Sequence, residues 1–546
     1  MIFINTTIFF LIYILGYISI SEYGSFFNKF LKVHKKENFT TNFFFGLIII
    51  FFLSFLIRTT IGYNEYINVV ILLFGIILSF KNLKTKIKYL VIPCLLFPGI
   101  LISKTHDDFV LYHYSYLNEF SQSNLILGLG NIDPRYSYSS LFVYIQAIFK
   151  LPTFDLAFFH VPIFLVYSGL INYLFFKYHS CKNNFTKFFI FFIQIFLLIK
   201  FKRLGEFGYD YLVQFILIFI FIELYQKGND PDYNFKKFLL FLFLISTKIT
   251  AIFFSPIILF FLYIKNFFHN LRIKYLYFLL IFLVINFTHN FLNSGCIHYV
   301  IPLTCFSSDN ISWVISVQEF QKDQEMIYLW AKNFYHQYGV ERIEDKISYL
   351  KNFTWIKHWF YRHFIEKIID SILLIFFLYF FLYPFTRKKL FESKEIKKLT
   401  FTFFIVLVSV CIWFLSLPQF RFGFFIVYLL FFFLLSLIFQ RSFIVTKKFY
   451  TYTIIFSFLF FLSSNLTRIY SEYKRVDHYS YADFPKFNLI NREYRQILFN
   501  DFGYFEPSDK VYSCYNVPSI CSTNIIKINV SNFMNKNFFI ISSVKK

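Results

Sequence analysis

Charged residues are scarce in this chain: Asp, Glu, Lys and Arg make up 16% of its 546 residues. Soluble globular domains contain about 25%. In their place stand 89 Phe and apolar runs such as FFFGLIIIFFLSFLI at 43–57, which have no water-facing side. The scarcity of charge therefore excludes a soluble enzyme, a coiled coil and a disordered tail. It predicts an all-α protein that crosses a membrane many times.

Several motifs are absent as well. No C-x-x-C pair occurs, which leaves a zinc or thioredoxin-like site without a basis. His358 and His363 are five residues apart and do not share a helix face, and no other histidine spacing suits a metal. Acidic residues are missing from the middle of the apolar stretches, where Gln194 is the strongly polar side chain. This pattern disfavours a proton-coupled transporter.

The net charge of +23 comes from 54 Lys and Arg against 31 Asp and Glu. Its distribution argues for a membrane topology and against nucleic-acid binding, because 26 of the 54 bases fall in short segments between apolar stretches. Such segments are typical of the cytoplasmic side. They are 27–38, 81–88, 177–187, 227–237, 265–274, 386–398 and 441–448.

The apolar stretches predict about 13–14 transmembrane helices. They are 4–20, 42–58, 66–81, 88–103, 156–177, 187–201, 211–226, 236–247, 249–264, 275–292, 367–384, 399–416, 421–440 and 449–463. The run 236–264 is interpreted as two short helices broken at Ser246-Thr247-Lys248, because a single helix would put segment 386–398 on the wrong side. The shorter stretch 138–150 predicts a helix lying at the membrane interface.

With the basic segments inside, the N-terminus and three polar segments lie outside: 103–137, 293–366 and 464–546. The first apolar run lacks a basic region and a cleavage site, so we expect a retained span. Within the second polar segment, residues 310–365 predict amphipathic helices along the membrane surface. In the third, the alternation in KVYSCY, IIKINV and NFFIISS predicts strands. The expected domains are a transmembrane unit, 1–463, and a small α+β extracytoplasmic cap, 464–546.

Four of the seven cysteines fall in the outer segments, where an oxidising compartment favours disulfides. The simplest pairing is Cys296–Cys305 and Cys514–Cys521. Four cysteines allow three pairings, so the others stay open.

Two carboxylates stand at the outer end of the span that closes near residue 103. Either Asp107 or Asp108 could take the proton of an attacking hydroxyl as a general base. The adjacent pair could instead bind a divalent cation, or be ordinary interface acids. No other cofactor is expected.

Further charged residues gather at the outer ends of spans: Arg203 and Asp210 in KRLGEFGYDY, Lys248 at the predicted break, and Arg421 in SLPQFRFG. Arg binds phosphate bidentately and Lys binds it as a point charge. Each base alone could reach lipid headgroups instead. Acids and bases converging on one face of a bundle favour a shared site.

Motifs spread over the chain resemble a family of bacterial membrane proteins of the GT-C glycosyltransferase type. They are D-x-x-L-Y-H at Asp108–His113, G-L-x-N-x-x-x-R at Gly128–Arg135 with Ser139-Ser140, Asp210, Lys248, Ser294-Gly295 through Trp313 to Trp330-Ala331, P-x-x-R-F at Pro418–Phe422, and C-Y-N-V-P-S-I-C at Cys514–Cys521. The small residues that follow the family's acid are here Phe109 and Val110, and Asp107 precedes it. Which aspartate acts therefore stays open.

The resemblance implies an inverting glycosyltransferase that takes a sugar from a polyprenyl-phosphate carrier and gives it to a glycan, lipid or protein acceptor outside a bacterial inner membrane. It implies Asp108 as base and Arg421 as phosphate ligand. Further candidates for substrate binding are Lys248, Arg135, His113, Asn131, Asp210 and Arg203. The alternatives are a polysaccharide polymerase or ligase, and a lipid-linked glycan flippase or other transporter. A phosphate leaving group needs no general acid, and the basic residues make a metal optional.

Overall fold

The structure is a computed structural model that describes most of the chain. The described residues are 2–31, 38–79, 86–101, 108, 112–121, 125–138, 140–152, 157–201, 209–226, 230–307, 310–337, 342–384, 387–390, 393–439, 441–474, 494–499, 502–507, 521, 528–533 and 538–543.

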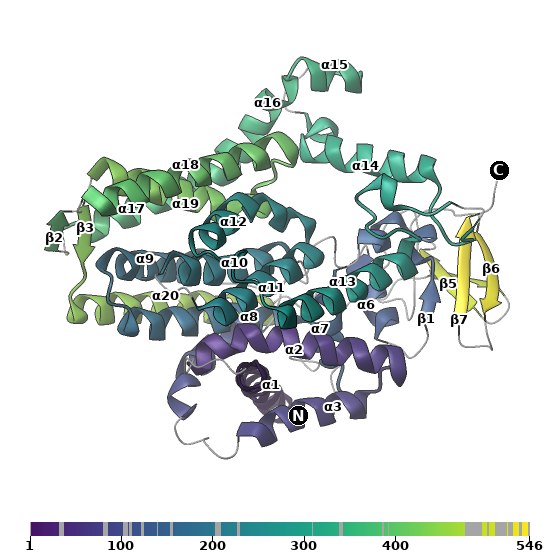
Figure 1. The fold of residues 1–546 in the computed structure, drawn as a ribbon, viewed down its shortest axis with the longest axis horizontal. Helices are drawn as coiled ribbons and strands as arrows, with labels where there is room; N and C mark the ends of the chain where they lie inside the picture. Colours follow the sequence, from purple (N-terminus) through teal and green to yellow (C-terminus); the bar gives the residue numbers. More distant parts are fainter. Residues whose placement is uncertain are drawn as a thin grey trace.

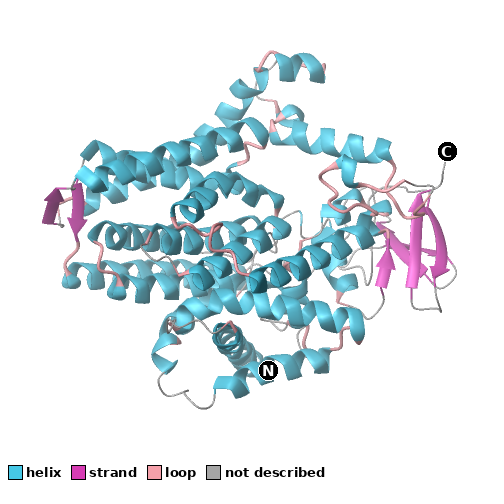
Figure 2. Cartoon of the chain, in the orientation of Figure 1, coloured by secondary structure: helices cyan, strands magenta, loops and turns pink. Residues whose placement is uncertain are grey.

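Long helices make up the body of the protein (Figure 1, Figure 2). Within the described ranges, seven of them are long and apolar enough to cross a membrane. They are α1 (Ile2–Phe30), α2 (Phe39–Thr60), α8 (Ala157–Ser180), α13 (Ile273–Ser294), α18 (Ser393–Ser416), α19 (Phe420–Phe439) and α20 (Lys447–Tyr473). They confirm the prediction of an all-α protein with several membrane spans.

The other expected spans coincide with shorter helical segments. These are α3 (Glu65–Ser79), α5 (Val91–Leu96) between the 3-10 turns η2 (Ile87–Tyr89) and η3 (Phe97–Gly99), α9 (Asn184–Lys200), α10 (Tyr209–Tyr225), α11 (Pro231–Thr247), η7 (Ile249–Phe254) with α12 (Ser255–Ile264), and α17 (Ile369–Leu382). The break between α11 and η7 falls at Lys248, whose backbone is extended. The prediction of two short helices in 236–264 is confirmed.

The first two helices pack with their backbones in contact. A Cβ atom at Gly46 would lie 1.7 Å from the carbonyl oxygen of Ile20, and one at Gly24 would lie 1.8 Å from that of Asn42. Small residues at a helix crossing permit this approach, as is common between membrane helices. The spacing Gly24–Gly46 thus sets the distance between α1 and α2.

The stretch 138–150 differs from its prediction. It forms α7 (Val143–Ile148), which is buried on all sides and packs against α2, α3 and α8 instead of lying at an interface. Asn68 of α3 donates to the Ala147 carbonyl at 2.9 Å, and Ser54 of α2 donates to the Tyr144 carbonyl. The Ala147 carbonyl also accepts from the Lys150 amide at 3.1 Å. Polar side chains of neighbouring helices thus add to the backbone bonds at the end of α7, which suits a helix that ends inside the bundle.

The three polar segments that were predicted to share one side meet at one end of the bundle. Strand β1 (Leu125–Leu127) pairs in parallel with β7 (Phe538–Ser543), which also pairs with β6 (Ile528–Phe533). The Asn131 amide donates to the carbonyls of Trp313 and Ile541 at 2.9 and 3.0 Å. The C-terminal tail therefore shares a sheet with the segment 103–137.

The rest of this end is made of short elements. These are α6 (Tyr114–Phe120), the 3-10 turns η5 (Leu129–Asn131), η6 (Pro134–Tyr138), η8 (Pro302–Thr304) and η9 (Phe334–His336), the helices α14 (Val317–Ala331), α15 (Lys346–Lys351) and α16 (Thr354–Trp359), the π-helical η10 (Phe360–Ile368), and the hairpin β4 (Tyr494–Phe499) with β5 (Phe502–Pro507). The predicted strands in IIKINV and NFFIISS overlap β6 and β7, whereas KVYSCY lies outside the described residues.

The described parts of the basic segments lie toward the opposite end (Figure 1). Strands β2 (Arg387–Leu390) and β3 (Arg441–Ile444) pair there. The Lys274 ammonium donates to the Leu31 carbonyl at 3.2 Å, and the Lys398 ammonium donates to the Tyr225 carbonyl at 2.8 Å. The separation of basic from other polar segments thus agrees with the predicted topology. Which end faces outside stays a prediction.

Candidate functional site

A cavity of about 1000 Å³ lies at the end where the three polar segments meet. Its walls come from the α11–η7 break, η6, α14, the turn between α18 and α19, and the residues Asp108, Tyr112 and His113. The predicted site residues among its lining are Asp108, His113, Arg135, Lys248 and Arg421. Positions more than 300 residues apart are thus brought to one space.

Four charged side chains form a charged cluster along this cavity. Arg421 Nη1 lies 3.3 Å from Asp108 Oδ2, and Arg421 Nε lies 3.2 Å from Asp210 Oδ2. Asp210 Oδ1 is 3.1 Å from Lys248 Nζ. The Asp210 carboxylate is 11% exposed, against 29% for Asp108 and for Lys248. Asp210 therefore anchors both cations from behind, while Asp108 and Lys248 are accessible from the cavity.

The turn between α18 and α19 positions Arg421. Pro418 cannot continue a helix, and the Trp359 indole donates to its carbonyl. The Trp413 indole donates to the Gln419 carbonyl at 3.1 Å, while the Gln419 amide donates to the Ala331 carbonyl at 3.0 Å. The turn is therefore fixed to three neighbouring segments.

An aromatic ring also faces the Arg421 side chain. Its guanidinium carbon lies 5.1 Å from the centroid of Trp330 on α14, a cation–π distance. The contact joins α14 to the charged cluster. The sequence marks Trp330 as part of a motif and does not predict its contact with Arg421.

The break at Lys248 brings its ammonium to the same cluster. The Lys248 amide closes the last turn of α11 onto the Leu244 carbonyl at 2.9 Å, and its own carbonyl accepts from Ala251 at 3.0 Å. The chain thus passes from α11 into η7 with one extended residue between them. The Lys248 ammonium lies 5.3 Å from the Phe422 ring, beside Arg421.

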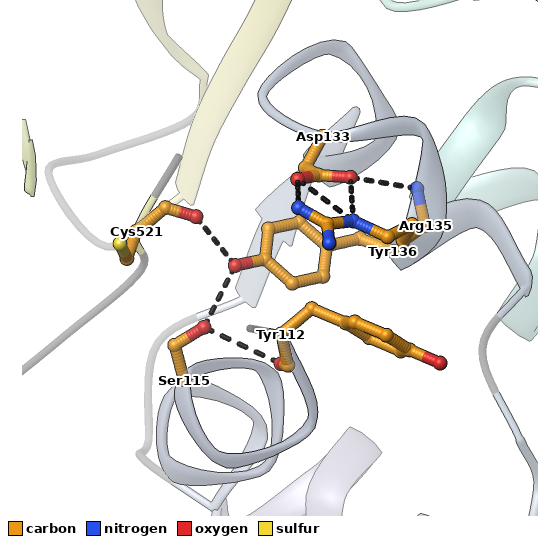
Figure 3. A network of polar contacts seen from close by, with 6 residues as sticks. All are labelled: Tyr112, Ser115, Asp133, Arg135, Tyr136 and Cys521. Carbon is orange, nitrogen blue, oxygen red and sulfur yellow. Dashed lines mark hydrogen bonds and ion pairs between the residues drawn. The ribbon is translucent and has the colours of Figure 1, made fainter. Parts of the chain in front are cut away.

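Arg135 is already paired. Its Nε lies 2.9 Å from Asp133 Oδ1, and its guanidinium carbon lies 5.1 Å from the Tyr112 ring (Figure 3). Burial alone would lower the pKa of Arg135, but hydrogen bonds and charge from Asp133 outweigh it and raise the pKa. Arg135 therefore stays cationic, with its charge balanced by Asp133.

The same loop is attached to the C-terminal tail. The Tyr136 hydroxyl donates to the Cys521 carbonyl at 2.5 Å and is 2.7 Å from the Ser115 hydroxyl (Figure 3). Ser115 belongs to α6, which directly follows the segment carrying Asp108. These bonds fix the cavity wall to the tail.

The cavity is also lined by a buried acid, Asp323, that the sequence analysis does not predict. Asp323 of α14 accepts hydrogen bonds from Tyr138 at 2.6 Å and Tyr299 at 3.3 Å. Burial raises the pKa of Asp323, although both hydroxyls counteract the shift. The sequence does contain an indication of this buried acid. Asp323 shares a helix face with Phe320 and Ile327, where an apolar residue is expected.

The remaining predicted residues lie elsewhere. Asn131 is buried between Trp313 and Ile541 and does not line the cavity, so its contacts are structural. The His113 ring packs edge-on against Tyr209 at 5.4 Å and borders the cavity. Asp107 and Arg203 lie outside the described residues.

The structure also tests the predicted disulfides and the possibility of a metal site. The predicted disulfide Cys296–Cys305 is confirmed. Cys521 is also disulfide-bonded, whereas Cys514 lies outside the described residues. In the part of the chain that the structure describes, no three His, Cys, Asp or Glu residues come together as metal ligands.

Comparison with known proteins places the chain in a family. No curated protein and no solved structure matches it. Residues 6–428 match the family described as a domain of unknown function, DUF8201. The matched range contains all four residues of the charged cluster. The protein therefore belongs to the DUF8201 family.

Proposed function

We propose that this protein is an integral-membrane inverting glycosyltransferase of the GT-C type, which moves a sugar from a polyprenyl-phosphate carrier to a glycan, lipid or protein acceptor. One observation carries the proposal: a carboxylate and two cations stand side by side on the wall of a 1000 Å³ cavity at one end of the bundle. Such a transfer requires a base for the acceptor and a cationic binding site for the leaving phosphate.

The donor phosphate is assigned to Arg421 and Lys248. Arg421 can present two parallel N–H groups to a phosphate, and Lys248 adds a second positive charge. Both cations are partly exposed to the cavity, and Asp210 holds them together. The phosphate-binding site is flanked by the apolar lining residues Ile249, Leu417 and Phe422, which suit the first isoprene units of a lipid carrier.

In the proposed step the acceptor hydroxyl gives its proton to the Asp108 carboxylate while its oxygen bonds to the anomeric carbon of the sugar. The bond from that carbon to the phosphate oxygen breaks, and its electron pair leaves with the phosphate. Attack from the face opposite the phosphate inverts the anomeric configuration, through an oxocarbenium-like transition state. Arg421 and Lys248 stabilise the charge that develops on the phosphate.

The topology belongs to the same proposal. About 13–14 helices cross a bacterial inner membrane, with the cavity, the N-terminus and the C-terminal cap on the extracytoplasmic side. The basic end then faces the cytoplasm, as the positive-inside rule requires. A disulfide at the cavity end, Cys296–Cys305, suits an oxidising compartment.

The test is the surface-glycan profile of cells, together with their lipid-linked intermediates, at matched membrane levels of each variant. Asp108→Asn should shorten the glycan by a defined sugar while the donor lipid is still made, because the amide cannot accept the proton. Glu325→Gln is the matched control, since Glu325 is exposed on α14 and pairs with Lys346 outside the cavity.

An unchanged profile for Asp108→Asn, in a strain where full deletion alters the glycan, would remove Asp108 as the base. Weight would then move to Asp107 or to transport of a lipid-linked glycan. A polymerase or ligase would instead leave single repeat units that fail to lengthen or to reach their final acceptor.

A further inference from the structure

A second cavity of about 1000 Å³ opens at the basic end of the bundle. It lies between α10, α12 and α18, and α12 packs against the other two helices (Figure 1). Helix α10 runs from Asp210 at the first cavity to Tyr225 at the second, a length of about 25 Å for its 17 residues. The two cavities thus lie at opposite ends of the helices, nearly a membrane thickness apart.

The walls of this groove are apolar. The rings of Phe260 on α12 and Phe401 on α18 stack at 5.9 Å with an interplanar angle of 7°. Leu224 and Phe261 close the floor and are buried, whereas Ile264 and Phe401 are exposed. A soluble anion would gain nothing from such walls, but an acyl chain would be removed from water by them.

The rim of the groove is basic. Lys398 donates to the Tyr225 carbonyl at 2.8 Å, and Lys265 donates to the Gln226 carbonyl at 2.7 Å, so both ammonium groups are held at the ends of the helices. Lys397 is exposed beside them and makes no ion pair with the described residues.

Basic residues outnumber acids in the described part of this rim. No acid stands among the described lining residues. Glu395, in the first turn of α18, is close enough to act on Tyr225. Among the described residues of the rim, three ammonium groups stand against the carboxylate of Glu395, which gives this part of the rim a net positive charge.

We infer that this groove binds an anionic phospholipid, with its acyl chain along Phe260 and Phe401 and its phosphate among Lys265, Lys397 and Lys398. The charge of the rim complements the headgroup, and the apolar walls complement the chain. Basic pockets between membrane helices on the cytoplasmic side recognise anionic headgroups in this way. The inference does not depend on the proposed transfer reaction, because it uses other residues at the other end of the molecule.

The experiment uses the full chain purified in detergent and supplied with phosphatidylglycerol, phosphatidylcholine or inorganic phosphate. Native mass spectrometry counts the lipids retained, and thermal unfolding reports the stabilisation. We expect phosphatidylglycerol to be retained and to raise the unfolding midpoint, and the other two ligands to do neither. Lys397→Gln with Lys398→Gln should reduce retention about tenfold or more, because it removes two of the three ammonium groups assigned to the phosphate.

The matched control is Lys447→Gln with Lys448→Gln, which removes two exposed lysines from the same end of the molecule, in the first turn of α20. It should retain phosphatidylglycerol as the wild type does. Lys397→Gln alone and Phe401→Ala keep the Lys398–Tyr225 bond, and each should weaken retention even if the double variant folds poorly.

Equal retention of phosphatidylcholine would overturn the inference, because the headgroup charge would then not matter. Equal stabilisation by inorganic phosphate would overturn the lipid assignment. Equal losses in the 397/398 and 447/448 variants would show that the whole basic end attracts anionic lipid without a defined site, and that result would also overturn it.

Discussion

At the scale of single residues, the charged cluster explains why Asp108 suits the role of base better than Asp210. Asp210 is the more buried carboxylate and faces two cations at 3.1 and 3.2 Å, so its charge is fully used in holding them. Asp108 Oδ2 lies 3.3 Å from Arg421 Nη1, and the Asp108 carboxylate is more exposed to the cavity. A phosphate that binds Arg421 would compete with Asp108 for that contact, and the exposure of Asp108 lets an acceptor hydroxyl reach it from the cavity.

Asp323 leads to a prediction about pH. Its pKa is raised in the folded protein, so its contribution to stability is fully present below the unfolded value of about 4 and is lost as pH rises through the raised folded value. Asp323→Asn removes this titration. We therefore expect the stability of the variant, relative to wild type, to improve as pH is raised from 4 to 7.

Thermal unfolding of both proteins across that pH range measures the difference. The absolute offset between them also contains the altered hydrogen bonds from Tyr138 and Tyr299. The pH dependence of the offset isolates the titration. A constant difference, or one that favours wild type at higher pH, would contradict the assignment.

Sequence reasoning identified some of these residues and missed others for physical reasons. Arg421 and Lys248 could be predicted because a charge at the end of an apolar span is visible without a structure. Trp330 acts through Arg421, and Asp323 acts through Tyr138 and Tyr299, which are partners that only the fold brings near. Such pairings leave no trace in spacing along the chain.

At the scale of elements, the crossing of α1 and α2 gives the clearest prediction. Gly46→Ala would place a methyl group within 1.7 Å of a backbone oxygen of α1, and backbone cannot move aside as a side chain can. We expect the variant to lose about 1–3 kcal/mol or more of stability, as for other overpacked cores. An SDS titration followed by circular dichroism measures the loss.

The control for that prediction is Leu56→Ala, on an exposed face of the same helix. It should unfold close to wild type, because a surface position away from packing changes stability by about 0.5 kcal/mol or less. If Gly46→Ala were as stable as this control, the close approach of α1 and α2 would be refuted.

Some elements could be predicted from the sequence and others could not. The break at Lys248 was predictable, because the side on which the basic segments fall depends on it. Helix α7 was not, because its burial depends on Asn68 and Ser54 reaching its carbonyls from other helices. The pairing of β1 with β7 was equally hidden, since the two strands are separated by some 400 residues.

At the scale of the whole molecule, charge and cavities are divided between two ends. One end has a cavity whose cluster balances two cations with two carboxylates, and the other has a groove with a net positive rim. In the proposed orientation, the first end meets the lipid-linked donor and the second meets anionic headgroups of the inner leaflet. One bundle would thus present different chemistry to each membrane surface.

The most direct measurement is the equilibrium binding of a polyprenyl monophosphate to the purified protein, compared among wild type, Lys248→Gln, Asp108→Asn and Glu325→Gln. Lys248→Gln leaves Asp210 paired with Arg421 and should bind about tenfold more weakly, through loss of one charged hydrogen bond. Asp108→Asn should bind more tightly than wild type, because the carboxylate that competes for Arg421 is gone, and Glu325→Gln should match wild type. Equal affinity for wild type and Lys248→Gln, or weaker binding by Asp108→Asn, would contradict the assignment of this cavity to a lipid-phosphate donor.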